Sequence, residues 1–327
     1  MSYAELHCIS NFTFLRGASH PGELVERAKT LGYAALALTD ECSLAGIVRA
    51  HAAAREAGLP LVVGSEFRLV DGLRFVALAT SRRGYAALSR LITRGRRAAP
   101  KGQYRLARSD LETGMEDCLA LWLPDAEPAI EQGAWLRERF EGCLWVAVEL
   151  TAAGRDRERL ERLSALAREL GLPIVAAGDV HMHQRRRRAM QDVLTAVRLK
   201  TTVALAGHAL FPNGERMLRP LSRIEALYPR PATDATRDIA ERCRFSLDEL
   251  CYEYPEEIVP GGTTATSHLR RLVEEGAVRR WPLGMPAAVR QLDLLKTQPR
   301  PSRLFSLPAA TRLKAALSTA SRGREEP

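Results

Sequence analysis

Short apolar runs rich in strand-forming residues alternate with helical patterns along the first part of the chain, and this order constrains the fold more than any other feature. Helical patterns cover residues 21–31, 43–57 and 155–170; the first opens with a proline and the other two stop at a glycine. The apolar runs occupy residues 34–39, 61–63, 75–79, 118–123, 144–150 and 174–177. Strand and helix in repeated succession predict an α/β protein with a parallel sheet or barrel.

Polar residues stand where several of these predicted strands end. The first strand runs into Asp40, the next reaches Glu66, and the last is followed by Asp179 and His181. His7, in the initial segment of the chain, is a further inward-facing candidate. Because the carboxyl ends of the strands in βα folds gather on one face, we expect these five side chains to lie close together.

Imidazole and carboxylate groups together suit zinc, manganese or iron, and two such metals can clamp a phosphoester and activate a water molecule. The five residues therefore indicate a divalent metal site suited to phosphoester hydrolysis. The alternative interpretation makes Asp40 and Asp179 helix or turn caps and the histidines surface groups; the joint occurrence at strand ends favours the site. Three more histidines are expected outside it: His20 at a helix start, His51 within a helix and His183 on the surface.

The charge of the chain points to a polyanionic partner. Lys and Arg number 48 against 39 Asp and Glu, giving a formal net charge of +9. Basic residues concentrate in the segment 80–109, which holds no acidic residue, and in the run 185–188. A solvated face is the alternative explanation of such runs. The candidate nucleic-acid-binding residues are Arg94, Arg96, Arg97 and Lys101.

Several classes of protein are not expected. The longest apolar stretches are far shorter than the roughly 20 residues that cross a bilayer, and residues 1–10 lack the basic leader and apolar run of a secretory signal. The six cysteines form no C-x-x-C pair, which favours buried, reduced thiols over a zinc or redox motif. We therefore expect a cytoplasmic protein with no membrane partner.

The pattern changes beyond about residue 206, where Pro- and Gly-marked turns become frequent. We expect a first domain over residues 1–253, a linker with one helix over 254–291, and a poorly ordered tail over 292–327. The tail lacks a regular apolar face, so we expect it to be dispensable and open to proteolysis.

Five segments of the chain stand out as motifs: ELHCISNFTFLRGASHP at 5–21, ALTD at 37–40, GSE at 64–66, AAGDVHMH at 176–183 and FPNGER at 211–216. Together they resemble the error-prone DNA polymerases related to the bacterial DNA polymerase III alpha subunit. The resemblance implies a PHP domain, a distorted (β/α)7 barrel that in some members carries a metal-dependent 3′ to 5′ exonuclease. It also implies DNA repair and translesion synthesis, with DNA, the palm and thumb domains, a sliding clamp and a Y-family accessory protein as partners.

The resemblance carries over only in part at the metal site. Where a metal-binding PHP domain has a second histidine, an aspartate and a third histidine, this chain has Ile9, Arg16 and Glu41. We therefore expect a degraded site with one weakly held divalent ion (zinc, manganese or magnesium) or none, whose carboxylates pair with groups such as Arg16. The positions that do match are His7, Asp40, Glu66, Asp179 and His181.

The resemblance makes residues 254–291 a linker to the palm with an incomplete start of the palm. It stops near residue 291, before the palm carboxylates with which the family holds two magnesium ions for nucleotidyl transfer. A truncated or frameshifted reading frame explains this, and we expect no primer extension by the chain. Three interpretations of function stay open. The chain is a structural PHP-domain fragment of an error-prone polymerase, a free-standing metal-dependent phosphoesterase or 3′ to 5′ exonuclease, or a non-catalytic nucleic-acid-binding module.

Overall fold

The computed structural model of the chain describes residues 2–112, 115–250, 259–282 and 284. The chain divides into two compact units, Met1–Cys251 and Tyr252–Pro327. The predicted domain boundary after residue 253 and the predicted tail at 292–327 lie outside the described residues. No helix within the described ranges is both long and apolar enough to cross a membrane.

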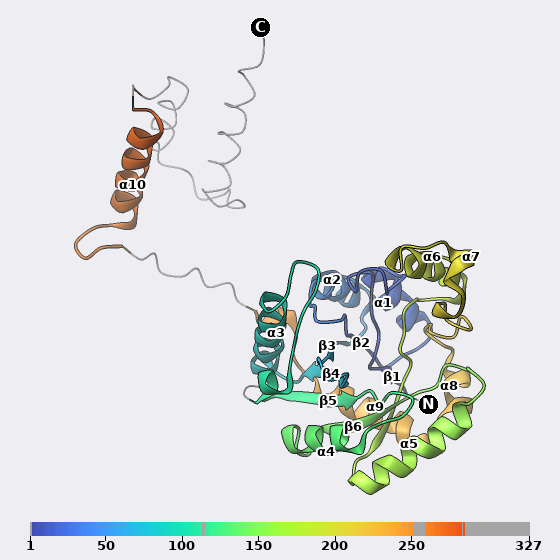
Figure 1. Ribbon diagram of the computed structural model, residues 1–327. Helices are drawn as coiled ribbons and strands as arrows, with labels where there is room; N and C mark the ends of the chain where they lie inside the picture. Colours follow the sequence, from blue (N-terminus) through green and yellow to red (C-terminus); the bar gives the residue numbers. More distant parts are fainter. Residues whose placement is uncertain (1, 113–114, 251–258, 283, 285–327) are drawn as a thin grey trace. The chain divides into compact units, whose positions relative to one another are not determined.

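A seven-stranded sheet, rolled into a nearly closed barrel, forms the centre of the first unit (Figure 1). The ring closes where Ile9 N donates to Val180 O and Val180 N donates to His7 O, both at 2.9 Å. The predicted distorted (β/α)7 barrel is confirmed. The strands, which follow the sheet in chain order, are β1 (Ala4–Glu5), β2 (Ala35–Leu38), β3 (Leu61–Arg68), β4 (Arg74–Ala79), β5 (Cys118–Trp122), β6 (Leu144–Glu149) and β7 (Ile174–Ala177).

One strand departs from the parallel arrangement. β4 runs antiparallel to β3 and β5, whereas the other neighbouring pairs are parallel. Residues 69–73 alone join β3 to β4, which is too short for a helical crossover, and Leu69 N donates to Leu73 O at 2.8 Å in a tight hairpin. Gly72 supplies the left-handed turn with a φ of 88°. The start of β4 therefore reaches the edge at which the parallel strands end, which we call the rim.

Helices cover the outside of the barrel (Figure 1). The predicted helices at 21–31, 43–57 and 155–170 are present with slightly different ends, and His20 is the residue that precedes the first. The helices of the first unit are α1 (Pro21–Thr30), α2 (Ile47–Ala57), α3 (Arg82–Arg97), α4 (Ile130–Arg139), α5 (Asp156–Leu170), α6 (Arg188–Arg198), α7 (Val203–Ala206), α8 (Leu221–Leu227) and α9 (Arg230–Arg242). The second unit contains α10 (Ala265–Arg280).

Alternation along the strands divides the apolar side chains between two layers. Leu36 and Phe75 belong to the larger layer, which packs against the surrounding helices. Ala37 and Leu121 belong to the smaller layer inside the barrel, where Ile239 of α9 also packs. Polar residues at the strand ends fit neither layer, so they gather at the rim.

Candidate functional site

Four of the five predicted metal ligands meet, buried, at the rim. His7 follows β1, and its Nε2 lies 3.5 Å from Oε2 of Glu66 in β3. His7 Nδ1 lies 4.0 Å from Oδ1 of Asp179, which also lies 3.0 Å from Nε2 of His181. Asp179 has a φ of 45°, so the backbone turns directly after β7. This turn keeps the side chains of Asp179 and His181 at the rim.

Glu149 is a rim residue that the sequence analysis missed. It is the last residue of β6, and its Oε1 lies 2.7 Å from Nδ1 of His7. His7, Glu149 and Asp179 each offer a ligand atom within 4.8 Å of the others, a spacing at which one cation can be held. The signal was present in the sequence, because Glu149 is the one charged residue in the apolar run 144–150 and stands near its end.

Asp40, the fifth predicted ligand, lies apart from this group. Its two oxygens accept hydrogen bonds from Ser10 N and Oγ, both at 2.8 Å, and from Thr13 Oγ1 at 2.6 Å. Burial raises the pKa of Asp40, and these hydrogen bonds oppose the rise. Alternation places the next residue, Glu41, beside Glu66 in a parallel bridge. Asp40 therefore holds the segment 10–17, which we call the rim loop and from which Arg16 reaches Glu66.

Guanidinium groups lie among the rim carboxylates. Arg16 NH2 lies 3.4 Å from Glu66 Oε2, and its NH1 forms an ion pair with Glu41. Arg74, at the start of the antiparallel β4, donates to Glu66 Oε1 from Nε at 3.3 Å and from NH2 at 3.0 Å. The predicted pairing of a rim carboxylate with Arg16 is confirmed, and Arg74 adds a second partner to the same carboxylate.

Arg216 brings a third guanidinium to the rim. It forms an ion pair with Asp179 and lies over the ring of Phe211, 4.3 Å from its centroid. The same ring meets His181 edge-on, with 5.2 Å between the centroids. Burial, reinforced by the neighbouring charge of Arg74, lowers the pKa of Arg216 to about 10. Arg216 thus stays charged at neutral pH while it occupies one oxygen of a predicted ligand.

The pKa shifts show how the rim balances its charge. Burial alone would lower the pKa of His7, but hydrogen bonds to Glu149 and Glu66 outweigh it and raise the pKa to about 9. Burial opposes ionisation of Glu149, yet the hydrogen bond from His7 lowers its pKa to about 2. Burial lowers the pKa of His181 to about 3, so this ring is neutral. A protonated His7 and three guanidiniums therefore face four carboxylates: Glu41, Glu66, Glu149 and Asp179.

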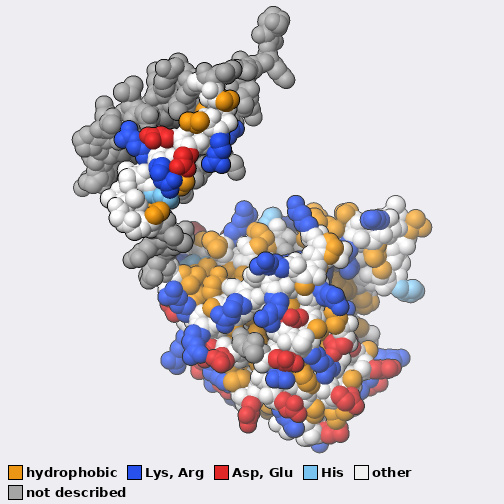
Figure 2. Space-filling model, turned by 60° about the vertical axis from the view of Figure 1, so that its left-hand side comes forward, with side chains coloured by type: hydrophobic (Ala, Val, Ile, Leu, Met, Phe, Trp, Pro, Cys, Tyr) orange, Lys and Arg blue, Asp and Glu red, His pale blue; other side chains and the backbone are white. Residues whose placement is uncertain are grey.

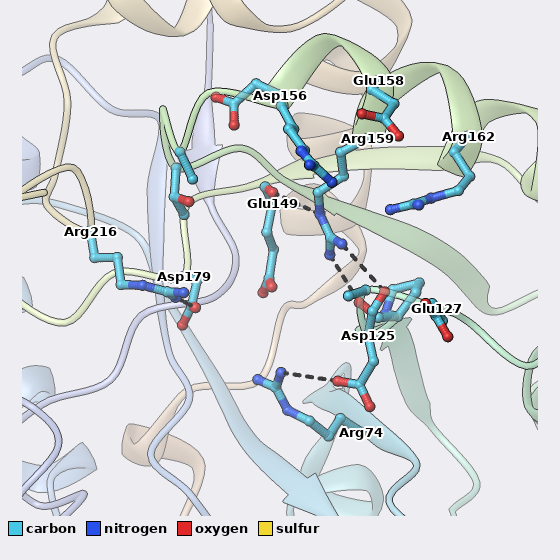
Figure 3. A pocket seen from close by; sticks show the side chains of 15 residues that line it. Arg74, Asp125, Glu127, Glu149, Asp156, Glu158, Arg159, Arg162, Asp179 and Arg216 are labelled. Atoms are coloured by element: carbon cyan, nitrogen blue, oxygen red, sulfur yellow. Dashed lines mark hydrogen bonds and ion pairs between the residues drawn. The ribbon is translucent and has the colours of Figure 1, made fainter. Parts of the chain in front are cut away.

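An open pocket of about 430 Å³ leads to this cluster. Figure 3 shows Arg216 meeting Asp179 on one wall, Arg74 directed at Asp125 on another, and Glu149 between them. The rim is therefore accessible to a small solute, although its innermost side chains are buried.

His183 corrects one expectation. It was predicted on the surface, but it is buried, with Nδ1 2.7 Å from Ser19 Oγ and its backbone N donating to the same oxygen at 2.9 Å. The reason lies in a distant segment: Met182 forms a parallel bridge with Met217, so the chain stays against the barrel beyond β7. His183 fixes the position of the loop before α1.

The predicted nucleic-acid-binding residues lie at the end of α3 and just after it. Arg96 donates to the backbone carbonyls of Cys42 and Glu41, at 3.1 and 3.2 Å, and so stabilises the fold. Arg94 donates to the carbonyl of Asp110 at 2.9 Å but stays exposed, as do Arg97 and Lys101. Figure 2, which turns the α3 side of the barrel forward, shows basic side chains spread over this face.

The barrel and its polar rim define the class of domain. Residues 5–156 match the family model described as "PHP domain", so this part of the chain is similar to PHP domains. Among solved structures, a sulfate-bound amidohydrolase of Chromobacterium violaceum is 16% identical, with a TM-score of 0.43 over 71% of this chain and 99% of that one.

The particular relatives are error-prone DNA polymerases. The error-prone DNA polymerase of Methylococcus capsulatus is 58% identical over 290 residues, which cover 88% of this chain and 28% of the relative. That of Dechloromonas aromatica is 58% identical over 294 residues, covering 88% of this chain and 29% of the relative. The predicted resemblance is confirmed, and the chain spans less than a third of the length of the curated relatives it matches.

Proposed function

We propose that this chain is the PHP domain of an error-prone DNA polymerase and that its rim stabilises the domain instead of hydrolysing phosphoesters. The observation that carries the proposal is the pairing of Arg16, Arg74 and Arg216 with carboxylates at the predicted metal site. These guanidiniums supply the positive charge that metal ions supply in a metal-dependent phosphoesterase.

The residues present do not fit a cluster of metal ions. Ile9 offers no ligand atom, and Arg16 places a cation beside Glu66. A single ion between His7 and Asp179 would have to remove the proton from His7 and displace Arg216 from Asp179, which leaves a largely buried guanidinium without its partner. We therefore propose that a divalent ion is weakly held or absent.

The role of the whole polymerase follows from the same proposal. We propose that the domain takes part in DNA repair and translesion synthesis in the cytoplasm, joined to palm and thumb domains that carry nucleotidyl transfer. DNA, a sliding clamp and a Y-family accessory protein are the proposed partners. The relatives are error-prone DNA polymerases, and this supports the DNA partner and the class of activity.

A metal-dependent phosphoesterase or 3′ to 5′ exonuclease is the second candidate. Two observations favour it: the His7, Glu149 and Asp179 group has the spacing of a cation site, and His181 Nδ1 is buried with no hydrogen-bond partner among the described residues. Both candidates share the same rim, so one set of measurements separates them.

The experiment measures metal content and turnover on the purified chain. Elemental analysis after dialysis against zinc and manganese should find less than one ion per chain. Hydrolysis of p-nitrophenyl phosphate and of a labelled DNA 3′ end should stay at background. One or more tightly held ions, together with turnover that Glu149→Gln abolishes while the fold is retained, would establish the phosphoesterase instead.

A further inference from the structure

Two of the three buried side chains of helix α6 are polar, while three of its large apolar side chains are exposed. Gln191 and Thr195 are only 2% and 3% exposed, whereas Met190, Val193 and Val197 are 47%, 45% and 55% exposed. A surface helix ordinarily turns its apolar stripe toward the core and its polar residues toward solvent. The spacing of the three exposed residues places them on one side of the helix. The barrel therefore does not account for the apolar side of α6.

The apolar surface continues beyond the end of α6. Leu199, Val203 and Leu205 are 45%, 40% and 78% exposed, and α7 packs beside α6 at the edge of the barrel (Figure 1). Large apolar side chains exposed together mark interaction surfaces, whereas scattered single ones do not. We call the surface made by these six residues of the segment 190–205 the α6–α7 face.

The buried side of α6 argues against a simple inward rotation of the apolar residues. Thr195 Oγ1 donates to the carbonyl of Gln191 at 3.0 Å, and Gln191 Oε1 has no hydrogen-bond partner in the described part of the chain. A helix that buries a polar atom at this cost is fixed in orientation by its neighbours. Its apolar stripe consequently stays available for another surface.

Basic residues flank the α6–α7 face at both ends of α6. Arg186 precedes the helix, Arg198 is its last residue and Lys200 follows it, and all three are exposed. The one acidic residue in the segment 185–205 is Asp192, which pairs with Arg188 at 3.0 Å. A partner with an apolar centre and acidic edges therefore complements this surface, as in protein interfaces with an apolar core and a polar rim.

We propose that the α6–α7 face is the surface on which another domain of the same polymerase docks, through an apolar patch edged by acidic residues. The inference rests on the proposed function, because this chain spans 28% of the Methylococcus capsulatus relative and the remainder of such a polymerase supplies further domains. A contact within one chain is permanent, which suits an apolar surface that would be costly to leave in water.

The test compares thiol labelling in the free chain and in a chimera. In the chimera, residues 1–282 of this chain replace the matching part of the Methylococcus capsulatus polymerase. Val193→Cys and Val197→Cys report on the α6–α7 face, and Val48→Cys and Val70→Cys are matched controls at apolar positions that are 67% and 60% exposed. Maleimide labelling, located by mass spectrometry, should be fast at all four sites in the free chain and slower by about tenfold or more at the first two in the chimera.

Equal labelling of all four sites in a folded chimera would overturn the proposal. Protection of V193C and V197C in the free chain, with a dimer in sedimentation, would assign the face to a second copy and would also overturn it. Protection that requires vesicles of anionic phospholipid would assign it to a membrane surface instead. None of these readouts involves metal or hydrolysis, so a metal-free, inactive rim with an unprotected α6–α7 face would refute the docking and leave the proposed function standing.

A second measurement uses this chain alone. The double variant Val193→Glu with Val197→Glu should bind less of a hydrophobic dye and keep its melting temperature within about 2 °C, because exposed substitutions cost little. A fall of many degrees would show that these side chains pack within their own unit, which contradicts the docking.

Discussion

Replacing Glu66 with glutamine removes one charge from the centre of the rim while keeping the size of the side chain. Glu66 is fully buried and faces Arg16 at 3.4 Å, Arg74 at 3.0 Å and His7 at 3.5 Å. Burial by itself would raise the pKa of Glu66, but these three groups hold it well below its usual range. At neutral pH the variant therefore leaves cations without their common partner.

The expected loss follows from the burial of these partners. Removing one member of a buried ion pair costs about 3–5 kcal/mol, and the side chains of Arg16 and Arg74 are 21% and 14% exposed. We expect a loss at the lower end, about 3 kcal/mol, because the two arginines keep some contact with solvent and glutamine keeps a hydrogen-bond acceptor. For a domain of this size that corresponds to a fall in Tm of about 6–12 °C.

The assay is urea unfolding at pH 7, followed by circular dichroism and repeated as a thermal melt. Glu161→Gln is the matched control, because Glu161 is 68% exposed and its pair with Arg157 is worth about 0.5 kcal/mol at most. The double variant Glu66→Gln with Arg74→Met should lose less stability than the two single variants together, because in the double variant neither charge is left without its partner. A Glu66→Gln variant as stable as the control would refute a stabilising charge network at the rim.

Three other predictions concern pH, the α3 surface and the rim loop. The pKa of His7 is raised to about 9, so the stability that its proton contributes is complete below pH 6.5 and is lost as the pH rises toward 9. The free energy of unfolding should fall by about 1.4 kcal/mol per pH unit between these values. The variant His7→Asn should flatten this pH profile, measured by urea unfolding. Replacing Arg90, Arg94 and Arg97 with alanine should weaken binding of a fluorescent single-stranded oligonucleotide and reduce the salt slope of that binding by about 2, whereas Arg157→Ala, the control, should leave both unchanged. An unaltered slope would leave the α3 face as a merely solvated surface. Gly17→Ala should cost about 1–3 kcal/mol or more, since the added Cβ would lie 1.9 Å from Ser10 O, whereas Gly22→Ala meets only Ala53 at 3.9 Å and should be tolerated; equal stability of the two variants in urea would contradict the packing of the rim loop.

Much of the fold could be predicted from local patterns. The apolar runs and helix boundaries indicated strands β2 to β7 and three of the covering helices, because side-chain periodicity and stop signals are properties of neighbouring residues. The positions of His7, Glu66, Asp179 and His181 at strand ends also predicted, from local pattern alone, that they lie close together. The same pattern applies to Glu149, which was not predicted because it lies within the apolar run 144–150.

What only the tertiary structure decided is the charge balance at that place. Arg74 reaches the rim because β4 runs antiparallel, and Arg216 reaches it because residues 216 and 217 return to pair with the chain after β7. Neighbouring residues in the sequence do not indicate that either arginine reaches the rim, since a contact between distant segments depends on strand direction and loop length. The sequence therefore determined which side chains gather at the rim from the strand ends. The closing of the barrel determined which distant arginines neutralise them, and hence whether a metal ion has room to bind.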